Sequence, residues 1–203
     1  MALARYLAST LGNNQMKREC GECQLCCKLL PVVSLNKVAN QKCEFQKFHK
    51  GCTVYRTKKM PIECHVWSCR WITSQLPDNM ARPDRVHFVV DTMPDNIVIQ
   101  DHEADTSHAM ECIVVWCDPK HPLAYRNPDL YNWVAEKNKV LMVRMNSRDS
   151  IIVFPPALNS THEWAEVTTE ASERDVVTKA VEDAIKAGYE RRNGPVQFNL
   201  AAR

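Results

Sequence analysis

The sequence predicts an α+β fold, in which an irregular cysteine-rich module in the N-terminal third joins a mainly antiparallel sheet with one long C-terminal helix. Three observations support this prediction. Eight of the ten cysteines lie between residues 20 and 69. Short segments rich in β-branched and aromatic residues, typical of strands, follow between residues 86 and 154. After residue 172 the apolar residues recur with the period of a helix that packs one face on a core.

The chain is expected to divide at two points. Leu3, Leu7 and Leu11 repeat every four residues, and Gly12 is suited to end a short amphipathic helix. Proline, asparagine and aspartate in residues 77–83 mark a boundary further along. The predicted units are an N-terminal amphipathic helix (1–17), a cysteine-rich metal-binding module (18–76) and an α+β body (77–203).

Charge and hydropathy narrow the function classes. The net charge of +2 gives no electrostatic reason to expect a nucleic-acid partner or an anionic membrane. No apolar run approaches the roughly 20 residues that span a bilayer. Arg5, Ser9 and Thr10 interrupt the first apolar stretch, which argues against a secretory signal, and a mitochondrial presequence would need more arginine. We therefore expect a reducing compartment, the cytoplasm, and a place in a virus particle stays open as an alternative.

The body is expected to contain five short strands and two helices. Residues 93–96 suit a hairpin turn between the first two strands, and residues 146–149 suit a hairpin loop between the last two. Asn127 and Pro128 are a cap and first residue for one helix, and Ser172 opens the pattern of the long C-terminal one. The expected strands cover residues 86–91, 97–100, 111–117, 139–145 and 150–154.

Two cysteines fall within a predicted strand of the body. Cys112 and Cys117 are an odd number of positions apart, so they should face opposite sides of the sheet. One metal ion cannot easily bind both, and we expect them to be buried free thiols.

The dense cysteines of residues 20–69 could form disulfides, bind a metal or take part in redox chemistry. Adjacent cysteines such as Cys26 and Cys27 cannot readily bond to each other, and a reducing compartment disfavours disulfides. Metal binding is therefore favoured. His65, between two of these cysteines, is a further candidate ligand, and Trp67 and Trp71 are expected to shield the site with apolar surface, a ligand-stacking role being the alternative.

The spacing of the first cysteines leaves the metal open. Cys20, Cys23 and Cys26 match the start of the bacterial ferredoxin run C-x2-C-x2-C-x3-C-P, but Leu30 stands at its fourth ligand position. Only one half of the paired C-x2-C pattern of zinc modules is present. If residues 20–30 are helical, Cys20, Cys23 and Cys27 share one face and Cys26 lies to its side.

A family resemblance covers about residues 18–72. The run Cys20-x2-Cys23-x2-Cys26-Cys27, followed by spaced single cysteines, resembles the CxxCxxCC cysteine-cluster family, whose members are described as zinc- or iron-chelating proteins. Some relatives are methylating enzymes that use a cluster, but residues 73–203 contain no cofactor loop for that chemistry. Lys58-Lys59-Met60 departs from the Arg-Pro step that members more often have. The resemblance implies metal binding through Cys20, Cys23, Cys26, Cys27, Cys52, Cys64 and Cys69, and Cys43 fits the spaced cysteine before Gly51.

These observations lead to three functional hypotheses. The first is a module, stapled by zinc or iron at one or two sites, that serves a structural or interaction role with protein partners, in a cellular assembly or a virus particle. The second is a redox or cluster-dependent protein that holds a 4Fe-4S cluster. The third is metal delivery or sensing. No catalytic residues are predicted, and no glycine-rich phosphate loop or nucleophile elbow is present. The candidate metal ligands are Cys20, Cys23, Cys26, Cys27, Cys43, Cys52, Cys64 and Cys69.

Overall fold

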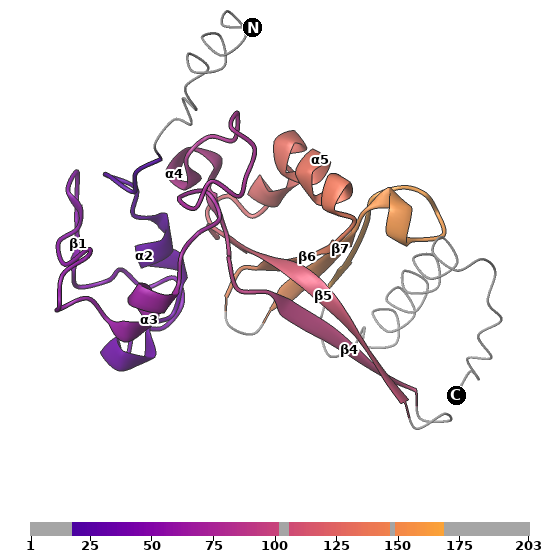
Figure 1. The fold of residues 1–203 in the computed structure, drawn as a ribbon, viewed down its shortest axis with the longest axis horizontal. Coiled ribbons are helices and arrows are strands. Elements are labelled where there is room, and N and C mark those ends of the chain that lie inside the picture. Colours follow the sequence, from indigo (N-terminus) through magenta and orange to yellow (C-terminus); the bar gives the residue numbers. More distant parts are fainter. Residues whose placement is uncertain (1–17, 102–105, 147–148, 169–203) are drawn as a thin grey trace, which may run out of the picture.

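The computed structural model describes residues 18–101, 106–146 and 149–168. Within these ranges the chain is an α+β structure built on a six-stranded sheet, with short helices around it (Figure 1). The helices predicted at the N-terminus and from Ser172 onward lie outside the described residues. In the described part of the chain, no helix is long and apolar enough to cross a membrane.

The sheet confirms the expectation of a mainly antiparallel body. Its strands follow the order β3-β5-β6-β7-β8, with β4 also paired to β5. The pair β5–β6 is parallel and the other pairs are antiparallel, so the sheet is mixed. The strands are β3 (Phe88–Val90), β4 (Asp95–Asp101), β5 (Thr106–Cys117), β6 (Val140–Arg144), β7 (Ser150–Phe154) and β8 (Ala165–Thr168).

The predicted hairpin between the first two strands of the body is wrong. β3 and β4 pair with β5 and not with each other, with Phe88 opposite Cys117 and Asp95 opposite Cys112. β5 is 12 residues long and can therefore pair with two short strands placed end to end along one edge. The strand predicted at residues 86–91 also begins later than expected, because the short helix α4 (Pro83–Val86) precedes it.

The parallel pair is connected by a helix, as parallel strands require. In the chain, the 3-10 helix η2 (Ala124–Arg126) and α5 (Pro128–Lys137) come after β5 and before β6. Figure 1 shows α5 over one face of the sheet. The predicted cap is confirmed, because the Asn127 side chain accepts hydrogen bonds from two backbone N–H groups at the start of the helix. Leu130 and Val134 are fully buried and belong to the core on one face of the sheet.

The second hairpin and the two strand cysteines agree with the sequence predictions. β6 and β7 pair across residues 146–149, with Leu141 opposite Val153. Cys117 belongs to the core beneath α5, whereas Cys112 belongs to a core on the other face with Phe154 and Leu158. Both are buried free thiols. Leu158 lies on the 3-10 helix η3 (Pro156–Leu158).

The cysteine-rich segment consists of very short elements next to the β3 end of the sheet (Figure 1). The helix that would span residues 20–30 is wrong in extent, because only residues 25–29 are helical. Residues 20–23 form a turn in which Gly21 has a left-handed φ of 49°, and this turn prevents an earlier helix start. The elements are α2 (Leu25–Leu29), η1 (Val33–Leu35), β1 (Gln46–Lys47), β2 (Gly51–Cys52) and α3 (Ile62–Val66).

Candidate metal centre

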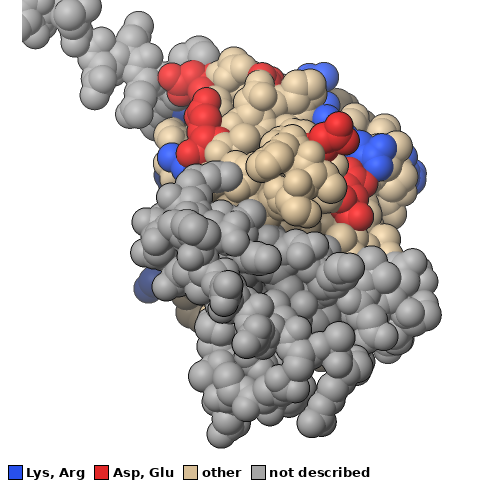
Figure 2. All heavy atoms as spheres, turned by 90° about the vertical axis from the view of Figure 1, so that its right-hand side faces the viewer, with Lys and Arg blue, Asp and Glu red and all other residues tan. Residues whose placement is uncertain are grey.

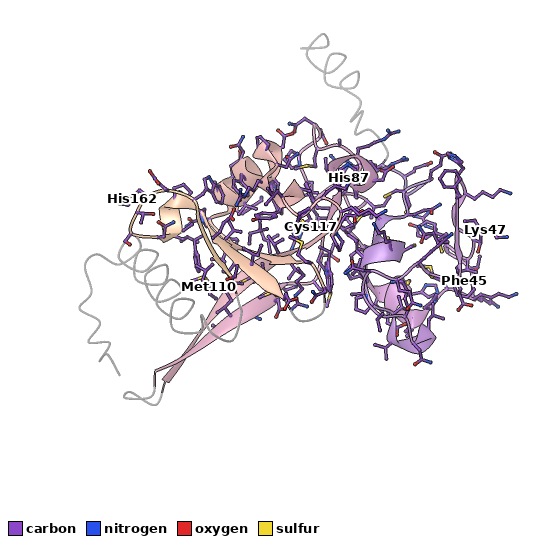
Figure 3. All side chains as sticks on the ribbon, turned by 180° about the vertical axis from the view of Figure 1, so that it is seen from behind. Phe45, Lys47, His87, Met110, Cys117 and His162 are labelled. Atoms are coloured by element: carbon purple, nitrogen blue, oxygen red, sulfur yellow. The ribbon has the colours of Figure 1, made fainter. Side chains whose placement is uncertain are left out.

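One cavity of about 180 Å³ collects the cysteines of residues 20–69. The segment is drawn with its side chains in Figure 3, where Phe45 of the cavity wall is labelled. Cys112 and Cys117 lie elsewhere, within the sheet cores. The cysteines that line the cavity are Cys20, Cys23, Cys26, Cys27, Cys43, Cys52, Cys64 and Cys69.

A close backbone approach brings the first cysteines and Cys52 together. In the turn of residues 20–23, the backbone N–H of Cys23 donates to the carbonyl oxygen of Cys20 over 2.9 Å. Gly51 packs against this turn so closely that a Cβ at position 51 would lie 2.3 Å from the carbonyl oxygen of Gly21. Only glycine permits this contact together with the φ of 73° found at Gly51.

The last two cysteines are held by hydrogen bonds around them. Cys64 lies on α3, where the neighbouring Glu63 carboxylate accepts from the backbone N–H and the hydroxyl of Ser34 at 2.8 and 2.7 Å. Cys69 forms an isolated antiparallel bridge with Asp91 at the edge of the sheet. The indole N–H of Trp67 donates to the Asp91 carboxylate over 2.7 Å. This bond holds the segment just before Cys69 against the same residue.

The rest of the cavity wall is largely apolar. Trp67 and Trp71 both line it, together with Phe45, Tyr55 and Met60. His65 does not line the cavity and is exposed, although its neighbour Cys64 does. The sequence signal for His65 was its position between two cysteines, and a helix of five residues turns adjacent side chains in different directions.

Burial and mutual repulsion oppose ionisation of most thiols in the cavity. Burial, together with the neighbouring thiols, raises the pKa of Cys20 to about 12 and the pKa of Cys64 to about 11. Cys23 likewise has a pKa raised by burial to about 11. Several thiolates would therefore require a compensating cation, which a bound metal ion provides.

Cys27 is the exception. The Cys26 thiol donates a hydrogen bond to it, and this bond, helped by the positive charge of Lys37, lowers the pKa of Cys27 to about 7 despite burial. The pKa of Cys26 is raised correspondingly, first by the same hydrogen bond and then by burial. The cavity thus holds one thiol that is partly ionised near neutral pH.

Lys37, a buried cation beside the thiols, is a residue that sequence reasoning missed. Only 6 % of the residue is exposed, and its ammonium group donates to the backbone carbonyl oxygens of Lys28, Leu30 and Val38. Burial lowers the pKa of Lys37, and the nearby thiols raise it, Cys43 most strongly. No sequence pattern indicated this position, because the carbonyl groups come from the end of α2 and the loop after it.

The donor chemistry fits zinc or an iron–sulfur cluster, because thiolate sulfur is a preferred ligand of both. All ten cysteines are free, so no disulfide competes for these sulfurs. Among the described residues, no three side chains of cysteine, histidine, aspartate or glutamate are arranged so that they could hold an ion. The eight thiols therefore surround a space and do not form a finished coordination sphere.

Charged side chains outside the cavity are of mixed sign where they can be seen. On the face shown in Figure 2, acidic and basic side chains are interspersed among uncharged ones. None of the protein-family models, curated proteins or solved structures compared with the chain matches it.

Proposed function

We propose that this chain is a metal-binding cysteine-cluster protein, in which zinc, iron or an iron–sulfur cluster staples residues 18–76 into a structural or interaction module. One observation supports this proposal above the others. Eight cysteines that are spread over 50 positions line a single cavity, whereas the remaining two are buried in the sheet. The resemblance of residues 18–72 to the CxxCxxCC family points to the same chemistry.

A staple explains how such a segment keeps its conformation. Its helices have five residues or fewer and its strands two, and elements of that length are not stable by themselves. Its apolar contact with the sheet is made by the buried side chains of Cys23, Leu25 and Leu29, with partly buried side chains packed around them. A metal bound through thiolates would cross-link distant parts of the segment, and its binding free energy would add to the stability of the fold.

The test is anaerobic purification of the full chain, followed by elemental analysis and by thermal unfolding with and without a strong chelator. We expect a stoichiometric metal and a lower melting temperature after chelation. Protein that contains no metal, or whose melting temperature is the same in chelator, would contradict the proposal. Slow or absent exchange of the bound metal would separate a staple from a delivery or sensing role, which needs a labile ion.

An iron–sulfur redox role is the second candidate. The cavity of about 180 Å³ exceeds the space of one water-sized group many times over, and a cluster with its inorganic sulfides fills more volume than a single ion. Cys20, Cys23 and Cys26 also match the first three ferredoxin positions. We expect a brown protein whose visible absorbance bleaches on reduction; a colourless protein with stoichiometric zinc would exclude this role.

Exposed apolar side chains support a role in protein interaction. Val33 and Phe48 are each 79 % exposed, and Ile62 and Val66 on α3 are 66 % and 73 % exposed. Such side chains on a metal-stapled module suit contact with a protein partner or a larger assembly. Light scattering of the metal-loaded chain should detect self-association, and replacement of Ile62 and Val66 by serine should abolish it.

A further inference from the structure

The cysteines of the cavity differ in whether they pack against the core next to the sheet. Cys23 belongs to a core cluster with Leu25 and Leu29 of α2 and with side chains of the sheet, and Cys26 and Cys69 pack against the same cluster. Cys20 is outside the cluster, but its thiol donates to the carbonyl oxygen of Cys23 over 3.7 Å. The remaining cavity cysteines are not part of that cluster: Cys27, Cys43, Cys52 and Cys64. The cavity therefore has one wall against the sheet and one wall in the loops.

The chain elements follow the same division. Cys69 is bridged to Asp91 next to β3, and the turn of residues 20–23 leads directly into α2. On the other wall, Cys52 is held by the β1–β2 hairpin and Cys64 by α3. Each wall thus obtains its cysteines from at least two separate segments.

The electrostatic interactions between thiols support this grouping. Among the thiols, Cys23 and Cys69 raise the pKa of Cys20 most, and Cys27 and Cys52 raise it less. The three thiols that raise the pKa of Cys64 all belong to the loop wall: Cys27, Cys43 and Cys52. The thiols that raise the pKa of Cys52 are Cys27 and Cys43. These interactions group Cys20 with Cys23 and Cys69, and Cys64 with Cys27, Cys43 and Cys52. Cys26 interacts with both groups, most strongly with Cys27 and then with Cys20 and Cys23.

Cys26 and Cys27 mark the division. Successive residues of a helix advance by about 100°, so these two side chains occupy neighbouring parts of the α2 surface, and the Cys26 thiol donates a hydrogen bond to Cys27. Cys26 packs toward the sheet core, and Cys27 interacts by a side-chain hydrogen bond with Cys52 of the loop wall. The doubled cysteine can thus supply one ligand to each of two neighbouring sites.

A positive charge lies near each group. Lys37 interacts with Cys43, Cys27 and Cys64, as well as with Cys26 at the division. Burial raises the pKa of Cys69, and the positive charge of Arg18 lowers it. Four thiolates around one divalent ion have an excess of two negative charges, and a nearby cation reduces the cost of burying that excess.

We propose that the cavity is built for two separate four-thiolate metal sites, a sheet-side site of Cys20, Cys23, Cys26 and Cys69 and a loop-side site of Cys27, Cys43, Cys52 and Cys64. This inference rests on the proposed metal-binding function and specifies its ligands. Each site takes either one zinc ion or one iron–sulfur cluster, since four thiolates satisfy both.

The first experiment counts metal in the full chain and in three variants, Cys69→Ala, Cys64→Ala and the control Cys112→Ala. We expect two zinc ions, or two clusters, in the wild type and in Cys112→Ala. Cys69→Ala and Cys64→Ala should each retain one, and a fourth variant that carries both substitutions should retain none. One metal centre per chain in the wild type, or loss of both centres in either single variant, would overturn the two-site assignment. Complete absence of metal in the wild type would instead refute the proposed function itself.

A second experiment uses the wild type alone, so that it does not depend on the folding of a variant. The metal-loaded chain is titrated with chelator while a thiol-alkylating reagent is present, and mass spectrometry locates the modified cysteines. We expect the four sheet-side cysteines to become reactive as one group and the four loop-side cysteines as another, at different chelator concentrations. Simultaneous exposure of all eight, or groups of other membership, would overturn the assignment.

Discussion

At the scale of single residues, Gly51 controls how the cavity closes. Its φ of 73° and the 2.3 Å that would separate an added Cβ from the carbonyl oxygen of Gly21 leave no room for a side chain. The obstacle is backbone, which cannot rotate out of the way. Gly51 therefore determines the distance between the turn of residues 20–23 and the strand of Cys52.

The first prediction concerns this contact. Gly51→Ala should lower the free energy of unfolding by at least about 2 kcal/mol, from the left-handed conformation plus the clash. Gly21→Ala is the matched control, because its φ of 49° is also left-handed but its Cβ would meet Arg82 at an ordinary 3.5 Å. It should cost only the conformational part, about 1 kcal/mol. Equal effects of the two substitutions in denaturant unfolding would contradict this account.

The second prediction concerns the reactivity of Cys27 in metal-free protein. Thiolate is the reactive form, so the thiol with the pKa lowered to about 7 should be alkylated first near neutral pH. Cys20 and Cys64, with pKa values raised to about 12 and about 11, should react only at higher pH. Mass spectrometry after brief alkylation between pH 6 and 9 measures the order, and earlier modification of Cys20 or Cys64 would refute it.

At the scale of elements, one ion pair joins α2 to the end of β5. The ammonium group of Lys28 lies 2.6 Å from the carboxylate of Asp118, of which only 9 % of the side chain is exposed. Burial alone would raise the pKa of Asp118, but the hydrogen bonds from Lys28 and from the backbone N–H of Lys120, together with the charge of Lys28, outweigh burial and lower it. The pair thus connects the helix of Cys26 and Cys27 to the longest strand of the sheet.

The third prediction follows from that lowered pKa. Asp118→Asn should destabilise the fold by about 1–3 kcal/mol at pH 7, because it leaves Lys28 without its charged partner. A carboxyl with a lowered folded pKa stabilises above its unfolded value of about 3.9 and loses that contribution as the pH falls through the folded value. The difference between variant and wild type should therefore shrink below about pH 4.

Its control is Asp78→Asn. Asp78 pairs with Arg18 at 3.6 Å, but 84 % of its side chain is exposed. Exposed pairs contribute little, so this substitution should change the free energy of unfolding by less than about 1 kcal/mol at pH 7. A cost at Asp78 as large as that at Asp118 would show that burial is not the reason for the effect.

At the scale of the whole molecule, two kinds of stabilisation meet at the face of β3 and β5. The sheet has its own apolar cores on both faces, including Val115, Leu141 and Val143 beneath α5. The cysteine-rich segment adds a third core through Leu25 and Leu29. We infer that the sheet can stay folded when the proposed metal is removed, whereas the segment around the cavity cannot.

The fourth prediction tests this difference by hydrogen exchange. After chelation, backbone amides of residues 18–76 should exchange much faster, because their short elements lose their cross-links. Amides of β5, β6 and β7 should keep their protection within about tenfold. Equal loss of protection in the sheet would mean that the two parts unfold together and that the metal supports the entire fold.

Local patterns predicted those parts of the fold whose interactions lie within a few residues. Asn127 caps α5 through backbone groups two and three positions away. The loop of residues 146–149 joins β6 and β7, and its Asn146 side chain accepts from the backbone N–H of Asp149. The opposite faces of Cys112 and Cys117 follow from the two-residue period of a strand.

Non-local contacts escaped those patterns. The pairing of both β3 and β4 with β5 depends on the length of a strand that follows them in the chain. The restriction of α2 to residues 25–29 depends on the turn at Gly21, against which Gly51 packs. Lys37 is an intermediate case, because the carbonyl groups around its ammonium group come from residues one, seven and nine positions away.

By itself, the sequence determined that eight cysteines are concentrated in residues 20–69 and that an α+β body follows them, because composition and short periods are properties of neighbouring residues. Only the tertiary structure decided that all eight line one cavity, and that some pack against the sheet while others lie in loops. The physical reason is that a cavity forms where distant segments meet, and their meeting depends on contacts such as Gly51 with Gly21 and Cys69 with Asp91.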